Sequence, residues 1–339
     1  MPRRVAPPVA APVNAAAATF IASTGGVRVA LHDLGGPDDP AAPVLFFAHA
    51  TGFHGRVWGP TAAPLTDRYR CLALDLRGHG VSETPDGASL QWTHMGDDVL
   101  AVLDAEGIGG YREVHGIGHS LGCAALVLAA SRRPGILRSL WLYEPAIVGP
   151  RVAAASDVAA PPDVALPREV AAPPDVAAAR DVAAPPGSTA PFGASNPMAD
   201  AARRRRASFA SYEEALANFA GKAPLNELHP DALAAYVTGG FAPRADGSVT
   251  LRCAPSTEAE VFAGAGNDEA FAALSMLDVP VALVAGRPDG FGPVTFVPTN
   301  LAQLRRGTLI ERRHLGHFGP LEDPPGMARD IAAWVEANR

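Results

Sequence analysis

The chain of 339 residues has few aromatic side chains, few cysteines and no apolar run long enough to span a bilayer. Aromatic residues make up only 6% of the chain, although 48% is hydrophobic, because alanine is abundant. The three cysteines, Cys71, Cys123 and Cys253, are widely spaced and lie in apolar segments. This pattern favours buried thiols over a disulfide framework, and with them a reducing, cytoplasmic compartment.

Basic side chains do not predominate either. The net charge is −7, with 28 Lys and Arg against 35 Asp and Glu, and this balance argues against a nucleic-acid-binding protein. The chain starts with Met-Pro-Arg-Arg, but prolines interrupt the apolar residues that follow and no leucine-rich core appears. We therefore expect a disordered Ala/Pro-rich tail over residues 1–18 instead of a signal peptide.

Short apolar runs alternate with helical patterns along most of the chain. A Gly25-Gly26 turn predicts a hairpin within residues 19–34, and apolar periodicity predicts helices over 93–106 and 326–337. Runs typical of strands buried on both faces occupy 43–48, 70–75, 113–117, 139–143, 279–285 and 307–312. The alternation predicts an α/β fold, with a doubly wound, mostly parallel sheet covered by helices on both faces.

The alternation breaks after residue 148. Five hexads in register fill residues 157–186, each of the form Asp/Glu-Val-Ala-Ala/Leu-Pro/Ala-Pro/Arg. A six-residue repeat can form a β-helix, but these prolines remove backbone donors and no bulky residue could fill a core. We expect disordered or polyproline-like chain instead. The core is thus predicted over 19–148 and 277–339, with a low-complexity linker at 149–194 and a cap at 195–276.

The cap is predicted to be mainly helical and to follow the sixth strand. Helical patterns cover 196–209, 212–220 and 230–237, and Asp246-Gly247 indicates a hairpin. The four arginines at 203–206 form either a solvated helix face or a contact to an acidic substrate group. Aromatic residues in the cap suggest a partly apolar substrate: Phe209, Tyr212, Phe219, Phe241 and Phe262.

A serine stands between an apolar run and a run of small and aliphatic residues, in Gly118-His119-Ser120-Leu121-Gly122. Strand, tight turn and helix form the context in which G-x-S-x-G acts as a nucleophile elbow. The glycines allow strand and helix to approach closely, and they allow the serine a strained backbone that projects its hydroxyl into a pocket.

A serine hydroxyl needs a base to take its proton and a third group to orient that base. Enzymes that use a nucleophile elbow of this kind have the chain order serine, acid, histidine, which would place the base near the C-terminus here. His317 lies in a loop before the terminal helix, whereas His314 follows the last strand closely and is expected to be structural. Two acids remain open: Glu144 ends the 139–143 strand, and Asp289 follows the strand that ends at residue 285.

Two backbone N–H groups are expected to stabilise the oxyanion. One belongs to Leu121, which follows the serine, and the other to Thr51, in the loop after the 43–48 strand. His49, in the same loop, is expected to bridge backbone groups. The remaining histidines have no metal-ligand spacing, and no zinc or P-loop signature is present, so we expect neither metal nor cofactor.

Together these motifs resemble the α/β-hydrolase fold family. Four segments occur in the family's order: His49-Ala50-Thr51-Gly52-Phe53, Asp75-Leu76-Arg77-Gly78-His79-Gly80-Val81-Ser82, the serine motif and Gly316-His317-Phe318. The resemblance covers residues 19–148 and 277–339, and it implies that Arg77-Gly78-His79-Gly80 is a structural turn. Ala50 replaces the family's usual glycine, and the Asp289 loop is unusually rich in Gly and Pro.

The resemblance also bears on the acid and on the reaction. Haloalkane dehalogenase-like members carry their acid at the strand position of Glu144, but they and the epoxide hydrolases use an aspartate nucleophile, against which Ser120 argues. We expect a hydrolase that cleaves an ester, thioester, lactone or similar acyl bond of a small molecule, with no nucleic-acid or membrane partner. The alternatives are a cofactor-free lyase or perhydrolase on the same triad, and a non-catalytic small-molecule-binding member. The sequence gives no indication of oligomeric state.

Overall fold

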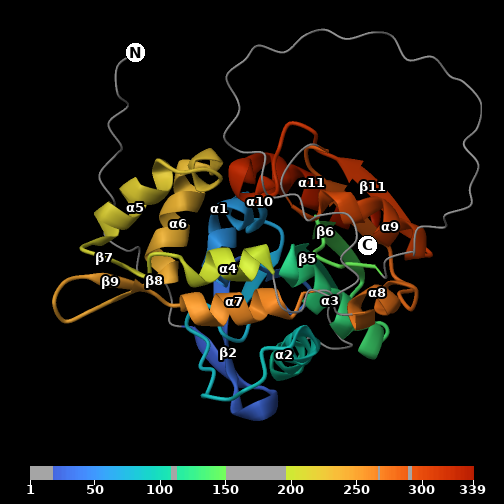
Figure 1. The fold of residues 1–339 in the computed structure, drawn as a ribbon. Helices are drawn as coiled ribbons and strands as arrows, with labels where there is room; N and C mark the ends of the chain where they lie inside the picture. Colours follow the sequence, from blue (N-terminus) through green and yellow to red (C-terminus); the bar gives the residue numbers. More distant parts are fainter. Residues whose placement is uncertain (1–17, 108–112, 150–195, 266–267, 289–291) are drawn as a thin grey trace, which may run out of the picture.

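The computed structural model describes residues 18–107, 113–149, 196–265, 268–288 and 292–339 (Figure 1). Its main sheet has the strand order β1-β2-β4-β3-β5-β6-β10-β11. The strands are β1 (Thr19–Ala22), β2 (Arg28–Gly35), β3 (Val44–Ala48), β4 (Arg70–Asp75), β5 (Val114–His119), β6 (Ser139–Tyr143), β10 (Val281–Ala285) and β11 (Gly307–Glu311). Only the pairings β1–β2 and β2–β4 are antiparallel, which confirms the mostly parallel sheet.

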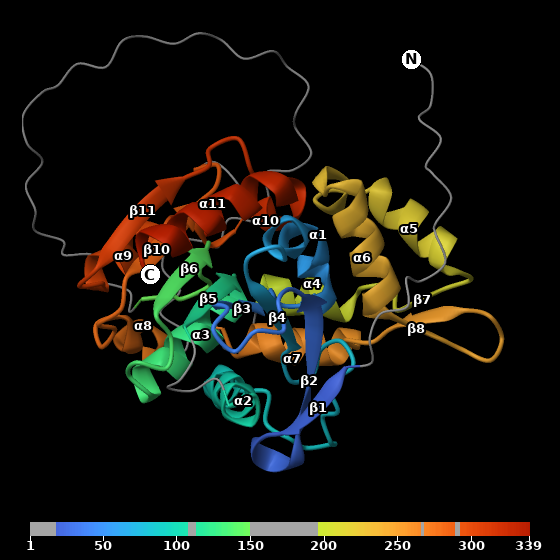
Figure 2. The same ribbon diagram turned by 180° about the vertical axis from the view of Figure 1, so that it is seen from behind.

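Helices cover both faces of this sheet (Figures 1 and 2). The core helices are α1 (Gly59–Ala62), α2 (Trp92–Ala105), α3 (Leu121–Arg132), α8 (Asp268–Leu274), α9 (Val297–Gln303), α10 (Gly319–Glu322) and α11 (Pro324–Ala337). Along β3, Phe46 packs with the cluster that contains α2, α3 and α8, whereas Phe47 packs with the one that contains α1 and α11. Burial on both faces explains the apolar runs of β3, β4, β5, β6 and β10. The prediction of a buried strand at 307–312 is wrong, because β11 is an edge strand with mostly exposed residues.

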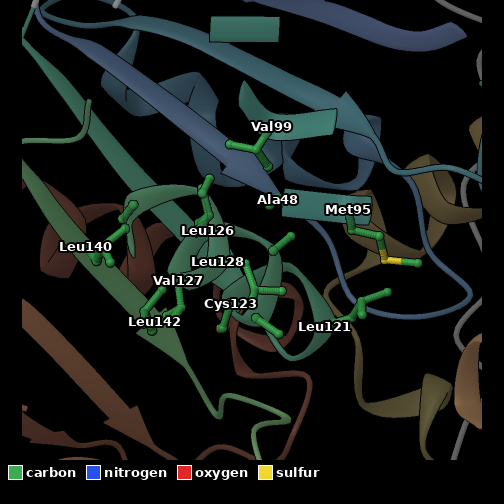
Figure 3. Packing of buried hydrophobic residues seen from close by; sticks show 14 of the residues in the cluster. Ala48, Met95, Val99, Leu121, Cys123, Leu126, Val127, Leu128, Leu140 and Leu142 are labelled. Atoms are coloured by element: carbon green, nitrogen blue, oxygen red, sulfur yellow. The ribbon is translucent and has the colours of Figure 1, made fainter. Parts of the chain in front are cut away.

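Helix α3 lies at the centre of one layer, and its residues from Leu121 to Ala130 are all buried. Figure 3 shows its side chains between those of β6 and α2. Small residues permit this close packing, since a Cβ at Gly122 would overlap the carbonyl group of Ala48 at the end of β3. The start of α3 is thus held against the loop that follows β3.

A segment between β6 and β10 carries its own helices and a small antiparallel sheet, β7-β9-β8. We call its described residues, 196–265, the inserted segment. It contains α4 (Pro197–Arg203), β7 (Ser208–Phe209), α5 (Tyr212–Ala220), α6 (Pro230–Gly240), β8 (Phe241–Pro243), β9 (Val249–Leu251) and α7 (Pro255–Ala263). Short 3₁₀ turns occur at Thr24–Gly26, Gly55–Trp58, Ala63–Leu65, Leu225–Glu227 and Pro293–Phe296.

The inserted segment differs from the sequence-based prediction in three places. The helix predicted over 196–209 ends at Arg203, because Ser208 and Phe209 pair with β9 as a strand. Helix α7 was not predicted. Helix α8, which the prediction placed in the cap, packs against α3 of the core, so its apolar side chains belong to the core layer.

Several other predictions are confirmed, and two concern segments outside the described residues. The helix at Tyr212–Ala220 and the hairpin at Asp246-Gly247, formed by β8 and β9, are confirmed. Apart from Ala18 and Gly149, the predicted tail (1–18) and linker (149–194) lie outside the described residues. The three cysteines are buried free thiols. In the ranges given above, no helix has the length and apolarity needed to cross a membrane.

Candidate active site

Ser120 occupies the turn between β5 and α3 in a strained backbone conformation, with φ 53° and ψ −111°. Its backbone N–H donates to the carbonyl of Tyr143 at 3.0 Å, and its own carbonyl accepts from Cys123 at 3.1 Å. Gly118 permits the sharp turn, because a Cβ there would lie 2.9 Å from the Cα of Cys123. The backbone contacts fix the strained serine in place.

Ser120 faces a cavity of about 420 Å³. The loop after β3 contributes Thr51 to its wall, and the loop after β11 contributes His317. The inserted segment contributes Asn196, Met198 and Phe262. Residues from both parts of the core and from the inserted segment therefore meet around the serine, and most of the wall is apolar.

His317 is hydrogen-bonded to Glu144. The distance between His317 Nδ1 and Glu144 Oε2 is 2.7 Å, and the carboxylate is 1% exposed. The second carboxylate oxygen, Oε1, accepts from the Gly286 N–H at 3.0 Å. Only glycine fits at position 286, since a Cβ there would lie 2.6 Å from Glu144 Oε1. With Nδ1 donating to the carboxylate, Nε2 of the imidazole is left as an acceptor.

The backbone on either side of the His317 ring is also anchored. The hydroxyl of Tyr143 donates to the Gly316 carbonyl at 2.7 Å, and His119 Nε2 donates to the His317 carbonyl at 2.8 Å. Burial, together with the nearby His317, lowers the pKa of His119, so this ring stays neutral. The Gly316 N–H donates to Glu322 at 2.8 Å. These bonds fix the loop that carries the histidine.

The sequence reasoning did not assign roles to Tyr143 and His119. Both are next to residues that it singled out, because Tyr143 precedes Glu144 and His119 precedes Ser120. Their positions next to two candidate residues were the only local indication that they belong to the site. Their partners lie 173 and 198 residues away along the chain, so the hydrogen bonds themselves could not be read from a local pattern.

The second candidate acid, Asp289, lies outside the described residues. The described part of its loop resumes at Gly292, where φ is 136° and a Cβ would lie 2.9 Å from Cγ of His317. His314 is exposed and is absent from the cavity wall described above. Of the two histidines and two acids considered, His317 and Glu144 are the pair that the described residues bring together.

Thr51 lies in the loop after β3 and shares the cavity wall with Ser120, and Leu121 is the first residue of α3. In the part of the chain that the structure describes, neither backbone N–H group donates a hydrogen bond to a protein acceptor. His49 bridges backbone groups as expected: Nδ1 donates to the Ala50 carbonyl at 2.8 Å and Nε2 accepts from Leu76 at 3.0 Å. Burial lowers the pKa of His49 to about 3, consistent with a neutral ring.

The arginines at 203–206 make contacts within the inserted segment. Arg205 pairs with the buried Glu258, and it also donates to the Tyr236 hydroxyl at 2.6 Å. Arg203 and Arg206 form exposed pairs with Asp200 and Glu214. The Glu258 carboxylate lies close to the loop after β3, because a Cβ at Gly52 would be 2.5 Å from its Oε1. Arg203 and Arg206 are thus solvated, whereas Arg205 makes structural contacts with Glu258 and Tyr236.

Of the five aromatic residues singled out in the cap, only Phe262 belongs to the described cavity wall. Phe209, Phe219 and Phe241 pack against one another, with ring centroids 5.6 to 6.0 Å apart. They form a small core of the inserted segment. These three rings therefore stabilise the segment itself and are not part of the described cavity wall, so of the five aromatic residues only Phe262 bears on the polarity of the cavity.

Arg77 has the structural role that the resemblance implied. Its buried guanidinium donates two hydrogen bonds, of 2.7 and 2.6 Å, to Asp98 on α2. This ion pair fixes the turn after β4 against α2. The turn contributes no residue to the described cavity wall.

A family model for the alpha/beta hydrolase fold matches residues 43–324. The 3-oxoadipate enol-lactonase 1 of Acinetobacter baylyi is 36% identical over 89 residues, which cover 26% of this chain and 31% of that protein. The 2-(acetamidomethylene)succinate hydrolase of Mesorhizobium japonicum is 31% identical over 102 residues, or 30% of this chain and 34% of that protein. The matches thus span about a third of these relatives.

The solved structures extend the likeness over nearly the whole chain. The crystal structure of an E-2-(acetamidomethylene)succinate hydrolase has a TM-score of 0.65 with this chain at 19% identity. The alignment covers 94% of this chain and 98% of that one. At this level of identity the likeness concerns the fold.

Proposed function

Because the chain belongs to the α/β-hydrolase fold family, we propose that it is a serine hydrolase that cleaves an acyl bond through an acyl-enzyme. The substrate is an ester, thioester, lactone or similar small molecule. The observation that carries this proposal is the His317 ring, hydrogen-bonded to a buried Glu144 at 2.7 Å and facing the same cavity as the strained Ser120. The relatives named as a lactonase and a hydrolase support the reaction class.

The reaction begins when Ser120 Oγ attacks the acyl carbon and His317 Nε2 takes the hydroxyl proton. The backbone N–H groups of Thr51 and Leu121 are proposed to donate to the developing oxyanion, since neither is bonded to an acceptor among the described residues. His317 then gives the proton to the leaving alkoxide or thiolate. A water molecule, deprotonated by the same nitrogen, then attacks the acyl-enzyme; the bond to Ser120 Oγ breaks, the acid is released, and the imidazolium returns the proton to Oγ.

Glu144 is the acid of the proposed triad. Its bond to Nδ1 selects the imidazole tautomer that presents Nε2 to the serine, and its charge stabilises the imidazolium formed during attack. Burial of the carboxylate and the second bond from Gly286 keep the carboxylate in one orientation. The inserted segment is proposed as the lid that shapes the cavity, since Asn196, Met198 and Phe262 form part of its wall.

Labelling with a fluorophosphonate probe tests this function. The wild-type protein should be labelled, and Ser120→Ala should lose both the label and hydrolysis of 4-nitrophenyl acetate, the latter by about 10⁴-fold or more. The matched control is Ser275→Ala, which removes an exposed serine after α8 and should retain both. Hydrolysis in ¹⁸O-labelled water should place one label in the acid product, as an acyl-enzyme opened by water requires. An unlabelled, inactive wild-type protein would exclude the proposal.

A further inference from the structure

We infer that the part of the substrate enclosed by the cavity is uncharged and apolar. This inference rests on the proposed function, because it concerns the substrate of the same site. It follows from the state of each polar side chain on the described wall. An enclosed polar or charged group needs a partner there, since burial without one is strongly unfavourable.

Two polar residues of the wall already use their hydrogen-bonding groups within the protein. Trp92 Nε1 donates to the Val261 carbonyl at 2.8 Å. Asn196 caps α4 through its side-chain oxygen, which accepts from Met198 and Ala199, and its amide nitrogen donates to the Phe262 carbonyl at 2.7 Å. Trp92 therefore has no donor left, and Asn196 keeps one neutral amide N–H, so neither residue supplies a cation for a substrate carboxylate or phosphate.

The remaining polar residues on the described wall are Thr51, Ser120 and His317, which belong to the proposed reaction centre. The other described wall residues are apolar and come from several elements, among them Met198, Phe262, Phe296 and Phe318. Within that described wall no lysine, arginine, aspartate or glutamate takes part. A substrate group distant from the scissile bond would therefore contact mainly apolar side chains of this wall.

The charges near the site also oppose an anionic substrate. Glu144 carries the carboxylate that is hydrogen-bonded to His317, so a second negative charge in the cavity would lie near it. Arg205, which reaches toward the loop after β3, is already paired with Glu258 and bonded to Tyr236. An acyl group ending in a carboxylate would lose its hydration without gaining a cation.

Three 4-nitrophenyl esters of matched shape test the inference: 6-methylheptanoate, adipamate and hemiadipate. They end in an isopropyl group, an amide and a carboxylate, respectively, on the same four-methylene chain. We expect kcat/KM for the hemiadipate to be at least about 100-fold below that for the 6-methylheptanoate, with the adipamate between them. Ser120→Ala supplies the background rate for each ester.

Binding to Ser120→Ala, measured by calorimetry, separates this inference from the proposed function. The variant keeps the cavity, and it should bind the esters in the same order as their kcat/KM values. If the wild-type protein does not turn over any ester but the binding order holds, the proposed function fails and the inference stands. Equal or tighter binding of the hemiadipate, or its equal turnover, would overturn the inference.

A charge placed in the wall provides the converse test. Met198→Lys should raise kcat/KM for the hemiadipate at least about 10-fold relative to the wild type and lower it for the 6-methylheptanoate. Met198→Gln, similar in length but uncharged, is the matched control and should not raise hemiadipate turnover to this extent. A failure of Met198→Lys to change the preference in a folded protein would count against the inference.

Discussion

The edge of the sheet that carries the proposed triad, called the catalytic edge below, and the inserted segment are stabilised in different ways. At the edge, Ser120 and Glu144 come directly after the neighbouring strands β5 and β6, and they are the two non-glycine residues with positive φ in the described chain. In the inserted segment, three phenylalanines and an ion pair between Arg205 and Glu258 hold short helices together. The edge therefore stores backbone strain, whereas the inserted segment has ordinary packing.

From this difference we expect the catalytic edge to govern the rate of the reaction and the inserted segment to govern the choice of substrate. Strained residues cost about 1 to 3 kcal/mol each and persist only where the surroundings determine their conformation. The buried strands and α3 provide such surroundings around Ser120. The inserted segment contributes apolar wall to the cavity, so we expect substitutions on that wall to change selectivity more than chemistry. Three predictions test the comparison, from the largest expected effect to the smallest.

The largest effect is expected from the acid at the catalytic edge. Glu144→Gln should lower kcat by about 10³- to 10⁴-fold, because the amide no longer holds the imidazole tautomer or stabilises the imidazolium. Asp289→Asn should lower kcat by less than about threefold. Steady-state kinetics of both variants, with thermal unfolding as a control for folding, gives the answer. A larger loss in Asp289→Asn than in Glu144→Gln would exchange the roles of the two acids.

The second prediction concerns acid stability. Burial lowers the pKa of His49 to about 3 and of His54 to about 4, and it also lowers that of His119. Below about pH 6.5 the unfolded chain binds more protons at these positions than the folded chain does. The contribution of the neutral, buried histidines to the free energy of unfolding is therefore complete above about pH 6.5. It should fall as the pH decreases from 6.5 to 4, by about 1.4 kcal/mol per pH unit for each histidine.

Denaturant unfolding at several pH values measures this slope. His49→Gln removes one of these histidines from the catalytic edge. It should reduce the slope of unfolding free energy against pH by about 1.4 kcal/mol per pH unit, which corresponds to one proton. His229→Gln, at a half-exposed residue that caps α6 in the inserted segment, should leave the slope unchanged. Equal slopes in wild type and His49→Gln would show that His49 does not contribute to acid unfolding.

The smallest effects should separate two phenylalanines of the inserted segment. Phe219 packs against Phe209 and Phe241, so Phe219→Leu should lower stability by about 1 to 1.5 kcal/mol and leave kcat/KM within about threefold. Phe262 lies on the cavity wall, so Phe262→Leu should change the acyl-chain-length preference up to about 10-fold with little loss of stability. The same outcome for both variants would contradict the division between packing and selectivity.

Local patterns predicted much of the fold because the core strands are buried on both faces. Continuous apolar runs marked β3, β4, β5 and β6, and glycines marked the elbow at Ser120. The candidate histidine was found because a loop before the last helix has a recognisable place in the chain order. Each of these signals lies within a few residues of the feature that it predicts.

The remaining features depend on contacts between distant residues. The choice between Glu144 and Asp289 required the position of His317, which is 173 residues from Glu144. The aromatic residues of the cap could not be divided into cavity wall and internal core from their sequence, since only packing distinguishes Phe262 from Phe219. Arg205 likewise finds Glu258 53 residues away, so its run of arginines carried no local signal of a structural role.

Val148 and Asn196 both lie on the wall of the cavity, one at each end of the 47-residue stretch between them. Val148 follows the buried Ile147 and Asn196 caps α4, so described residues fix both positions on the wall. The entropy of loop closure grows only logarithmically with length, by about 0.6 kcal/mol for each doubling. We therefore expect a change in the number of hexads to cost little folding free energy, while the two residues at the cavity keep their positions.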